Sequence, residues 1–530
     1  MLKLKEASLN WAIKHINKYN DTYIFPRPFE FEAINQNWTE VLDYLKSLNI
    51  LECGIRPYRS EITPKSQVGF RISTQLDPLD SIIYNAIIYE IFRDIEKARI
   101  DKSLNKVYSF RLAPENDGTL YDNNYNWDSF NQQAQEISRS EEYKYVVVTD
   151  IADFYPSIYL HNIETVLREC VKESGKSAHA ETIINIIKAM HVIQTHKGLP
   201  IGPQFSRPIA ELILDEIDRI LINDEIEFIR YVDDYRIFCK SESEAYRALS
   251  FLAQKLYDLR NLKLNEQKTK ILAKANFQKN YLRIFKDKEN DRRLNEFHEL
   301  CEKIGISTSS YDDIDIEELD PVDKEALEQL NIFELLAKEL NEDAPDLGFA
   351  KFLLNNLAKF DNTDVAELIL NEVNIRKVFP ILRSFIGYLE RVRSFSEEQK
   401  YKIGKLILDL FDDSFITELK FNRAWLINLF TVNEEWNNKE QFLVLYRKYD
   451  DNTTRRELLL SLGRSKNQSF YRENKMANLA NYDHWLCRAF IAGISCLPED
   501  ERRPWYKSRG YMQRDFLDKI IEKWAIKKPF

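Results

Sequence analysis

The stretch that most constrains this chain runs from Glu227 to Cys239, where two adjacent aspartates separate two runs of β-branched and aromatic residues. Such runs favour strands, so the stretch predicts a tight hairpin with Asp233 and Asp234 at its tip. A hairpin turn often uses one Asp, whose side chain bonds the turn's own backbone. A second Asp adds like-charge repulsion that the turn does not require, and a bound divalent cation would relieve it.

A further acid ends the strongly apolar run that begins at Tyr143 and reaches Asp150. A strand this apolar is usually buried on both faces, so Asp150 projects from a rigid element at the edge of a sheet. An acid placed there serves either as a helix N-cap or as a metal ligand. Asp153 is the better candidate for the cap, because it lies nearer the next expected helix.

From Tyr143 to Leu272 the expected elements are a strand, helices, the hairpin, a helix and a strand, which is the split β-α-β pattern of a ferredoxin-like sheet. In that topology Asp150 and the Asp233-Asp234 pair can meet. After about Ala275 strand signals disappear, and successive amphipathic helices without a strict repeat period favour an irregular array of the HEAT type. The expected fold class is α+β.

Four basic side chains gather in a loop-rich stretch near the N-terminus, namely Arg56, Arg59, Lys65 and Arg71. They could form a phosphate-binding patch, because Arg and Lys neutralise phosphate oxygens. A solvated loop is the alternative, since basic residues mostly lie exposed.

A second loop, Lys197 to Arg207, is punctuated by Gly and Pro and opens a long amphipathic helix. The N–H groups at the start of that helix could face a phosphate or a base pair, with Ser206 as its first residue. An ordinary loop and cap is the alternative.

The formal net charge of −10 over 530 residues argues against bulk electrostatic binding to long duplex DNA, although a local basic channel remains open. No apolar run approaches the roughly 18 to 20 residues that cross a bilayer. The first residues lack a secretory signal, and the six cysteines suggest neither a zinc site nor a disulfide framework. A cytoplasmic protein without a membrane partner is expected.

Three aspartates that converge from a strand end and a hairpin tip fit two-metal phosphoryl transfer. In that chemistry two cations about 3.5 to 4 Å apart activate the attacking hydroxyl and hold the leaving pyrophosphate. Mg²⁺ is the natural occupant, because it prefers oxygen ligands shared between carboxylates, water and substrate phosphates. Mn²⁺ is the alternative ion.

Several segments of the chain resemble the motifs of one enzyme family. Tyr231-Val-Asp-Asp234 resembles motif C of reverse transcriptases, and Asp150-Ile-Ala-Asp-Phe-Tyr-Pro-Ser157 resembles their motif A. Further matches follow in order over roughly the first half of the chain: Phe70-Arg71 and Phe110-Arg111 resemble two fingers motifs, Leu199-Pro-Ile-Gly202 through Ser206-Arg207 resembles motif B, and Asn265 to Thr269 resembles motif D.

The resemblance implies a role for each matched position. Asp150, Asp233 and Asp234 would be catalytic and, together with Ile151, would hold the two metal ions. Five residues would bind the nucleotide: Arg71 by gripping the incoming triphosphate, Tyr155 as a steric gate against a 2′-hydroxyl, Lys268 as a proton donor near the departing pyrophosphate, and Lys65 and Gly202 as further contacts.

The resemblance also implies three parts. Residues 1–135 are expected to form an N-terminal extension and fingers, residues 136–278 a palm with the catalytic motifs, and residues 279–530 an α-helical HEAT-like domain.

Among reverse transcriptases, the bacterial abortive-infection subgroup is the one that the chain resembles, through Phe25-Pro-Arg-Pro-Phe-Glu30, Gly198 to Pro203, Ser206-Arg207 and the helical second half. That resemblance implies antiphage defence, a helical domain in place of an ordinary thumb, and a homo-oligomer. It also implies synthesis from dNTPs that needs no template and starts on a protein hydroxyl, which leaves single-stranded DNA attached covalently. Tyr19, Tyr23, Tyr44 and Tyr58 are candidates for the priming residue by availability.

Two departures bear on how the enzyme works. Ile201 stands where motif B usually carries Gln, which removes one polar contact to the nucleotide, and no primer-grip or thumb pattern follows Lys274. Both weaken the case for ordinary copying of a long template and leave untemplated synthesis open. Two alternatives remain: a template-copying enzyme of the retron or intron kind, and a non-catalytic helical scaffold that binds a phage or host protein.

Overall fold

The computed structural model describes residues 1–190, 198–282, 332–412, 414–432, 436, 439–474, 479, 482–509, 515–527 and 530. Lys197, the first residue of the predicted loop, and residues 283–331 of the predicted third domain lie outside the described residues. The chain divides into two compact units. We call Met1–Tyr23, Leu42–Tyr58 and Thr74–Asn295 the sheet unit, and Ile24–Val41, Arg59–Ser73 and Glu296–Phe530 the helical unit.

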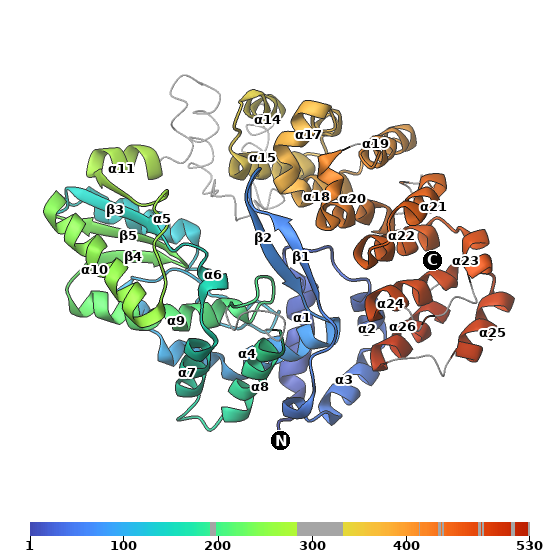
Figure 1. Cartoon of the computed structure of the whole chain (residues 1–530), viewed down its shortest axis with the longest axis horizontal. Helices are drawn as coiled ribbons and strands as arrows, with labels where there is room; N and C mark the ends of the chain where they lie inside the picture. The colour runs from blue at the N-terminus through green and yellow to red at the C-terminus, as the bar shows by residue number, and fades with distance from the viewer. Residues whose placement is uncertain are drawn as a thin grey trace. The chain divides into compact units, whose positions relative to one another are not determined.

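The sheet unit is built on a four-stranded antiparallel sheet with the order β4-β5-β3-β6 (Figure 1). The strands are β3 (Tyr145–Asp150), β4 (Glu227–Tyr231), β5 (Asp234–Cys239) and β6 (Lys270–Ala273). Taken in chain order, the fourth strand lies beside the first, then come the third and the second. This is the split β-α-β arrangement that the sequence predicted.

Helices cover both faces of this sheet. On one face Val146, Ile229 and Phe238 form a buried cluster with Phe130 of α5 (Trp127–Arg139) and Phe277 of α11 (Lys274–Tyr281). Because side chains alternate along a strand, the neighbouring apolar residues face the opposite side, where α9 (Ser206–Asn223) and α10 (Glu242–Arg260) contact the strands. The sheet is therefore a rigid core layer whose strand ends can hold a site.

The sheet unit contains further helices. They are α1 (Glu6–Tyr19), α4 (Pro78–Ala98), α6 (Phe154–Ser157), α7 (Leu160–Cys170) and α8 (Ser177–Met190), with the short 3₁₀ turns η1 (Ile50–Glu52) and η2 (Lys102–Leu104). One helix, α3 (Trp38–Ser47), crosses the boundary between the two units.

The helical unit contains only helices among the residues described after Tyr281, as the sequence predicted. Alternate helices pack in succession, α15 on α18, α18 on α20, α20 on α22, α22 on α24 and α24 on α26. The HEAT type of this array stays a prediction. The bounds are α2 (Glu30–Gln36), α14 (Ile332–Asn341), α15 (Leu347–Lys359), α16 (Val365–Ile369), α17 (Glu372–Val378), α18 (Leu382–Arg391), α19 (Glu397–Asp409), α20 (Lys420–Val432), α21 (Lys439–Lys448), α22 (Asn452–Arg464), α23 (Gln468–Asn474), α24 (His484–Gly493), α25 (Glu499–Arg509) and α26 (Phe516–Lys527).

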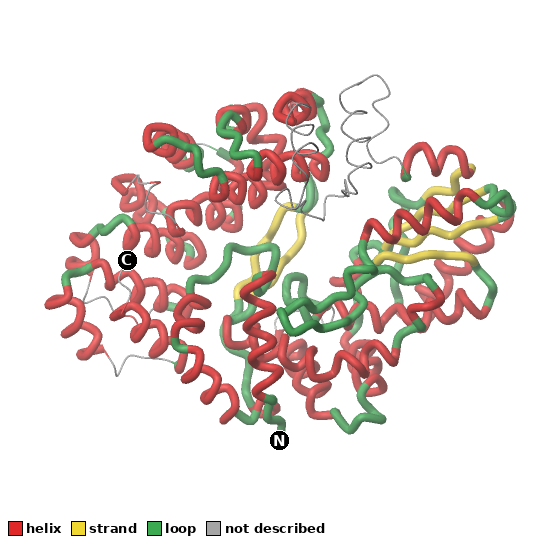
Figure 2. Tube along the Cα trace, turned by 180° about the vertical axis from the view of Figure 1, so that it is seen from behind, coloured by secondary structure: helices red, strands yellow, loops and turns green. Residues whose placement is uncertain are grey.

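The strands β1 (Arg59–Pro64) and β2 (Phe70–Gln75) form a separate two-stranded sheet (Figure 2). Its residues up to Ser73 belong to the helical unit, so β2 begins in one unit and ends in the other.

Two N-terminal segments join the helical unit because buried polar contacts tie them to it. The Glu30 carboxylate is fully buried and accepts a hydrogen bond from Arg456 at 2.7 Å. Thr453 Oγ1 donates to Glu61 at 2.5 Å. A buried charge is retained only with a partner, so these segments follow their partners across more than 390 residues of sequence. The predicted three-part division remains a prediction.

No helix in the described ranges combines the length and the apolar character that crossing a lipid bilayer requires.

Candidate active site

The three predicted aspartates lie together at the end of β3 and in the β4–β5 turn. Each offers one carboxylate oxygen, and these oxygens lie within 4.8 Å of one another. The pairing of β3 with β5 sets Asp150 opposite Asp234, and the Ile151 N–H donates to the carbonyl oxygen of Asp233 at 3.2 Å. The strand register therefore brings together two sequence segments more than 80 residues apart.

The turn that carries Asp233 is strained. Val232 has a φ of +55°, a left-handed conformation that a β-branched residue rarely adopts and that costs roughly 1–3 kcal/mol. Two side chains hold it: Ser109 Oγ accepts from the Val232 N–H at 2.9 Å, and Arg230 donates to the Val232 carbonyl at 2.8 Å. Groups outside the turn therefore stabilise its strained backbone conformation, and this fixes the position of Asp233.

The carboxylates repel one another. Burial, together with the charges of Asp234 and Asp150, raises the pKa of Asp233 to about 7. Lys268 partly balances them, with its ammonium 2.9 Å from an oxygen of Asp150. Burial alone would lower the pKa of Lys268, but its hydrogen bond to Asp150 and the nearby acids raise it. Three oxygen donors with a surplus of negative charge fit a divalent cation that prefers oxygen ligands.

Ile151, the fourth predicted metal residue, offers no side-chain donor and is buried. Only its backbone carbonyl oxygen could join the three carboxylates. Asp153 differs from the prediction: it precedes α6 with a φ of +43°, and its side chain forms no capping hydrogen bond. The left-handed backbone gives Asp153 another orientation, so the cap prediction is wrong.

The loop that resembles motif B packs against β2 through Gly202. This glycine has a φ of +130°, and a Cβ placed there would lie 2.0 Å from the carbonyl oxygen of Thr74. The Thr74 N–H donates to the Ile201 carbonyl at 2.7 Å, and the Leu199 N–H donates to the Tyr155 carbonyl at 2.8 Å. Only glycine allows this close approach, so Gly202 shapes the loop whether or not it contacts a nucleotide.

Tyr155 belongs to the segment that resembles motif A and lies in α6. Burial raises the pKa of its phenol well above the ordinary value, with Arg207 opposing the shift. The hydroxyl therefore stays protonated at neutral pH and remains a neutral, bulky side chain beside the aspartates.

The comparison with known families bears on the same span. Residues 79–292 match the family model described as reverse transcriptase (RNA-dependent DNA polymerase), and this span contains Asp150, Asp233 and Asp234. The chain contains a reverse transcriptase domain.

Solved structures similar to the chain include three telomerases. Apo telomerase from Candida tropicalis truncated from the C-terminal domain is 12% identical, with 41% of this chain and 49% of that chain covered and a TM-score of 0.30. Telomerase from Candida albicans in complex with the TWJ fragment of telomeric RNA is 11% identical, with 79% and 71% covered and a TM-score of 0.31. Apo telomerase from Candida tropicalis is 11% identical, with 76% and 70% covered and a TM-score of 0.31.

This chain therefore spans about half the length of the truncated Candida tropicalis protein. No curated protein matches the sequence.

Within the reverse transcriptase domain a buried charge network supports the turn that carries Asp233, which the sequence motifs did not predict. Arg230, 1% exposed, donates to Asp218 at 2.9 Å and to Glu211 at 3.1 Å. Arg99 donates to the same Glu211 at 2.8 Å. Burial alone would lower the pKa of Arg230, but Asp218 and Glu211 raise it well above its ordinary value. The sequence signal for this network was the presence of two acids, Glu211 and Asp218, among the apolar residues on the buried face of α9.

The structure sets the predicted nucleotide residues in different units. Lys268 and Tyr155 belong to the sheet unit with the aspartates, whereas Lys65 and Arg71 belong to the helical unit. Lys65 is exposed in the β1–β2 turn, where its N–H donates to the Gly69 carbonyl at 2.8 Å. Within the described structure the buried Nε of Arg71 has no hydrogen-bond partner, as is also found for the Nε of Arg456 and of Arg502.

Proposed function

We propose that this chain synthesises DNA from dNTPs by two-metal phosphoryl transfer at Asp150, Asp233 and Asp234. The observation that carries the proposal is the convergence of three carboxylate oxygens within 4.8 Å. The raised pKa of Asp233 supports it, because a cation would replace the proton that the repelling carboxylates retain. We further propose that synthesis needs no template and starts on a hydroxyl of the protein, in antiphage defence of the abortive-infection kind.

Each residue has a distinct task in this proposal. Two Mg²⁺ ions, or Mn²⁺ in their place, would activate the attacking hydroxyl and stabilise the leaving pyrophosphate. Lys268 carries a proton close to Asp150 and can donate it to the pyrophosphate. The phenol of Tyr155 excludes a 2′-hydroxyl and so selects dNTPs. Arg71 grips the triphosphate, with its guanidinium as a bidentate donor.

Untemplated synthesis is supported by the motif B loop. Ile201 places an apolar side chain where reverse transcriptases usually have an amide, and its carbonyl is already bonded to the Thr74 N–H. The loop therefore offers no side-chain hydrogen bond at this position to align a nucleotide against a template. The helical unit, as a HEAT-like domain in place of a thumb, belongs to the same proposal.

Protein priming requires an accessible hydroxyl. Of the four candidates by availability, Tyr19 is 42% exposed and Tyr23 is 37% exposed, whereas Tyr44 and Tyr58 are partly buried. All four remain candidates.

The test incubates the purified full-length protein with dNTPs and Mg²⁺, with and without a template, and analyses the products on a denaturing gel. We expect DNA that remains linked to protein without any template, and peptide mass spectrometry then identifies the linked residue. The double variant Asp233→Asn/Asp234→Asn is the inactive control. Strictly template-dependent extension with no linked DNA would overturn both untemplated synthesis and protein priming.

The cellular part of the proposal is a cytoplasmic homo-oligomer that protects against phage. Light scattering after size exclusion measures the subunit number, and phage plating on cells that express the wild type or the double variant measures protection. Equal protection by both proteins would contradict a defence role for DNA synthesis.

A second candidate function is template-copying synthesis of the retron or intron kind. The description of the matched family, an RNA-dependent DNA polymerase, favours it. Extension of an annealed primer on an RNA template, absent without the template, would support this candidate.

A further inference from the structure

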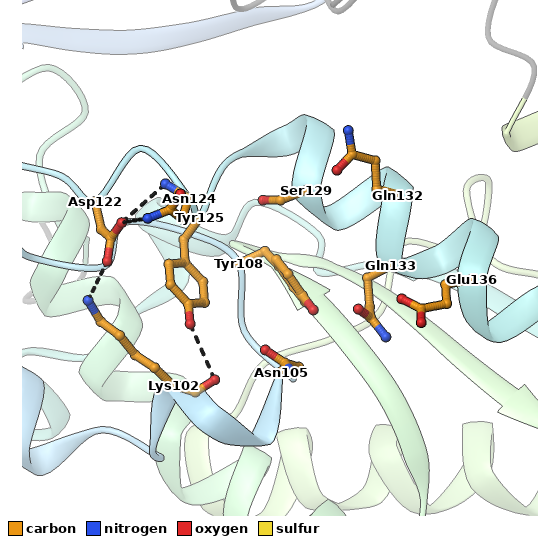
Figure 3. A pocket seen from close by; sticks show the side chains of 10 residues that line it. All are labelled: Lys102, Asn105, Tyr108, Asp122, Asn124, Tyr125, Ser129, Gln132, Gln133 and Glu136. Atoms are coloured by element: carbon orange, nitrogen blue, oxygen red, sulfur yellow. Dashed lines mark hydrogen bonds and ion pairs between the residues drawn. The ribbon is translucent and has the colours of Figure 1, made fainter. Parts of the chain in front are cut away.

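A cavity of about 500 Å³ lies in the reverse transcriptase domain, and none of the three aspartates lines it (Figure 3). Its volume is within the range of small-molecule sites, roughly 300–1,000 Å³. Its walls come from η2, the segment that follows it, a loop and α5. The lining residues are Lys102, Asn105, Tyr108, Asp122, Asn124, Tyr125, Ser129, Gln132, Gln133 and Glu136.

The charged groups at one end of the cavity are already paired. Lys102 forms an ion pair with Asp122 at 2.7 Å, and Asp122 also accepts from the backbone N–H of Asn124 at 3.1 Å. The Tyr125 hydroxyl donates to the Lys102 carbonyl at 3.4 Å. The lining holds one basic and two acidic side chains, with Glu136 as the second acid. A phosphate would find no surplus positive charge there.

The uncharged part of the lining combines flat rings with amides. The rings of Tyr108 and Tyr125 lie 5.9 Å apart with their planes inclined by 36°. The side-chain amides of Asn105, Gln132 and Gln133 form no hydrogen bond within the described residues. In Figure 3 the ends of Tyr108, Gln133 and Asn105 come near one another.

This chemistry selects one class of ligand. An amide presents a donor and an acceptor in one plane, which matches the edge of a base. Tyr108 is 5% exposed and Lys102 lies 5.3 Å from the centroid of the Tyr125 ring, so the rings offer a base apolar contact rather than a free stacking face. We propose that the cavity formed by Tyr108, Tyr125 and the amides of Asn105 and Gln133 binds a nucleobase, while the phosphates of any attached strand stay outside.

The cavity is also linked to the catalytic turn through the main chain. The Tyr108 N–H donates to the Arg230 carbonyl at 3.0 Å, and the next residue, Ser109, holds the strained Val232 at 2.9 Å. A base that contacts Tyr108 in the cavity therefore contacts the segment that supports the turn of Asp233.

The test measures binding of adenosine, cytidine, guanosine and uridine to the full-length protein in EDTA by saturation-transfer NMR and calorimetry. The same titration uses an eight-nucleotide oligodeoxynucleotide and its abasic counterpart. Gln133→Leu removes one amide, and Gln135→Leu is the matched control, because Gln135 is exposed on the same helix but does not line the cavity. A net hydrogen bond of 0.5–1.5 kcal/mol corresponds to a loss of affinity of about 2- to 12-fold.

We expect Gln133→Leu to weaken binding by that factor while Gln135→Leu leaves it unchanged. Gln132→Leu, at an exposed lining position, provides a second variant if Gln133→Leu loses its native circular dichroism. Binding of free nucleosides identifies the free base as a sufficient ligand, whereas binding of the oligonucleotide but neither nucleosides nor abasic strand identifies a base within a strand. Equal binding by wild type and both lining variants would overturn the proposal.

The assay is independent of DNA synthesis. The double variant Asp233→Asn/Asp234→Asn should bind the nucleobase as the wild type does, so a failure of the proposed polymerase activity leaves this result readable.

Discussion

Two clusters in this molecule each contain three potential metal ligands, but the charges of their acidic side chains are balanced differently. Asp150, Asp233 and Asp234 form one in the sheet unit, and His484, Asp515 and Asp518 form the other in the helical unit. In each, three ligand atoms lie within 4.8 Å of one another. Proximity alone would mark both as metal sites.

The second cluster already contains its counter-charge. The fully buried Arg488 donates to Asp515 at 2.7 Å and to Asp518 at 3.1 Å, and His484 Nδ1 lies 3.1 Å from Asp515. Burial alone would raise the pKa of Asp515, but His484 and Arg488 outweigh it and hold the pKa well below its ordinary range. In the first cluster the pKa of Asp233 rises to about 7. Charge balance, rather than geometry, distinguishes a candidate metal centre from a structural ion cluster.

The largest expected effect is the loss of catalysis in the first cluster. Asp233→Asn should reduce DNA synthesis by more than about 100-fold, since even residues that only orient metal ligands cost about 10–100-fold. Fold should be retained, because the substitution also removes repulsion. Asp515→Asn, in a cluster without a proposed catalytic role, is the matched comparison, and its rate per folded molecule should equal that of the wild type. Comparable losses in both variants would remove the distinction.

The next effect is on stability in the second cluster. Arg488→Met leaves the buried Asp518 and the partly exposed Asp515 without their cation, and breaking a buried pair in this way costs about 3–5 kcal/mol. Urea denaturation measures the change in the free energy of unfolding. Lys97→Met is the control, because its ion pair with Glu173 lies on the surface, with exposed fractions of 75% and 80%, and such pairs contribute about 0–1 kcal/mol. If both variants lost equally little, Arg488 would not be the balancing charge.

Metal ions should act on the first cluster alone. A ligand that binds only the folded state stabilises it by about 2.7 kcal/mol at a concentration 100 times its dissociation constant. Thermal unfolding with Mg²⁺ or Mn²⁺ should therefore show a higher Tm for the wild type and for His484→Ala. The same ions should leave the Tm of Asp233→Asn/Asp234→Asn unchanged. If the metal-dependent rise in Tm disappeared in His484→Ala, the ion would bind at the second cluster and the prediction would be wrong.

The features of the fold and of the candidate site that the sequence could predict are those that depend on local sequence patterns. The apolar run that ends at Asp150 and the two runs around Asp233-Asp234 specify strands, and the order of strands and helices then brings the acids together. The successive helices after Tyr281 carry the same kind of signal. The prediction of an N-cap side chain at Asp153 is wrong, because the general preference for Asp at N-cap positions does not fix the backbone conformation of a particular Asp.

The charge pairs had no such signal. Arg230 bonds Asp218 and Glu211, and Glu30 bonds Arg456, which lies 426 residues away. A charged residue at a buried position requires a partner, but the sequence does not identify that partner, because the pairing depends on tertiary packing. For the same reason no local signal indicated that Lys65 and Arg71 belong to a segment whose contacts group it with the helical unit.

The last expected difference between the clusters is in their pH dependence. Asp233 ordinarily has a pKa of 3.8 and in the folded protein about 7, so between these values the folded state holds a proton that the unfolded chain releases. Stability from this group is thus greatest below pH 4, falls as the pH rises to 7 and is constant above it. Asp233→Asn removes the trend, so its gain in Tm over the wild type should grow from pH 4 to pH 7.

Asp515 should show the reverse, because a lowered pKa stabilises the folded state above the ordinary value and loses that effect as the pH falls. The cost of Asp515→Asn should be full at neutral pH and should shrink in acid. Measuring both variants against the wild type by metal-free thermal unfolding from pH 3 to pH 8 gives two difference curves of opposite slope. Parallel curves would mean that the carboxylates of the first cluster are as well balanced as those of the second, and the argument for a cation between Asp150, Asp233 and Asp234 would lose its electrostatic basis.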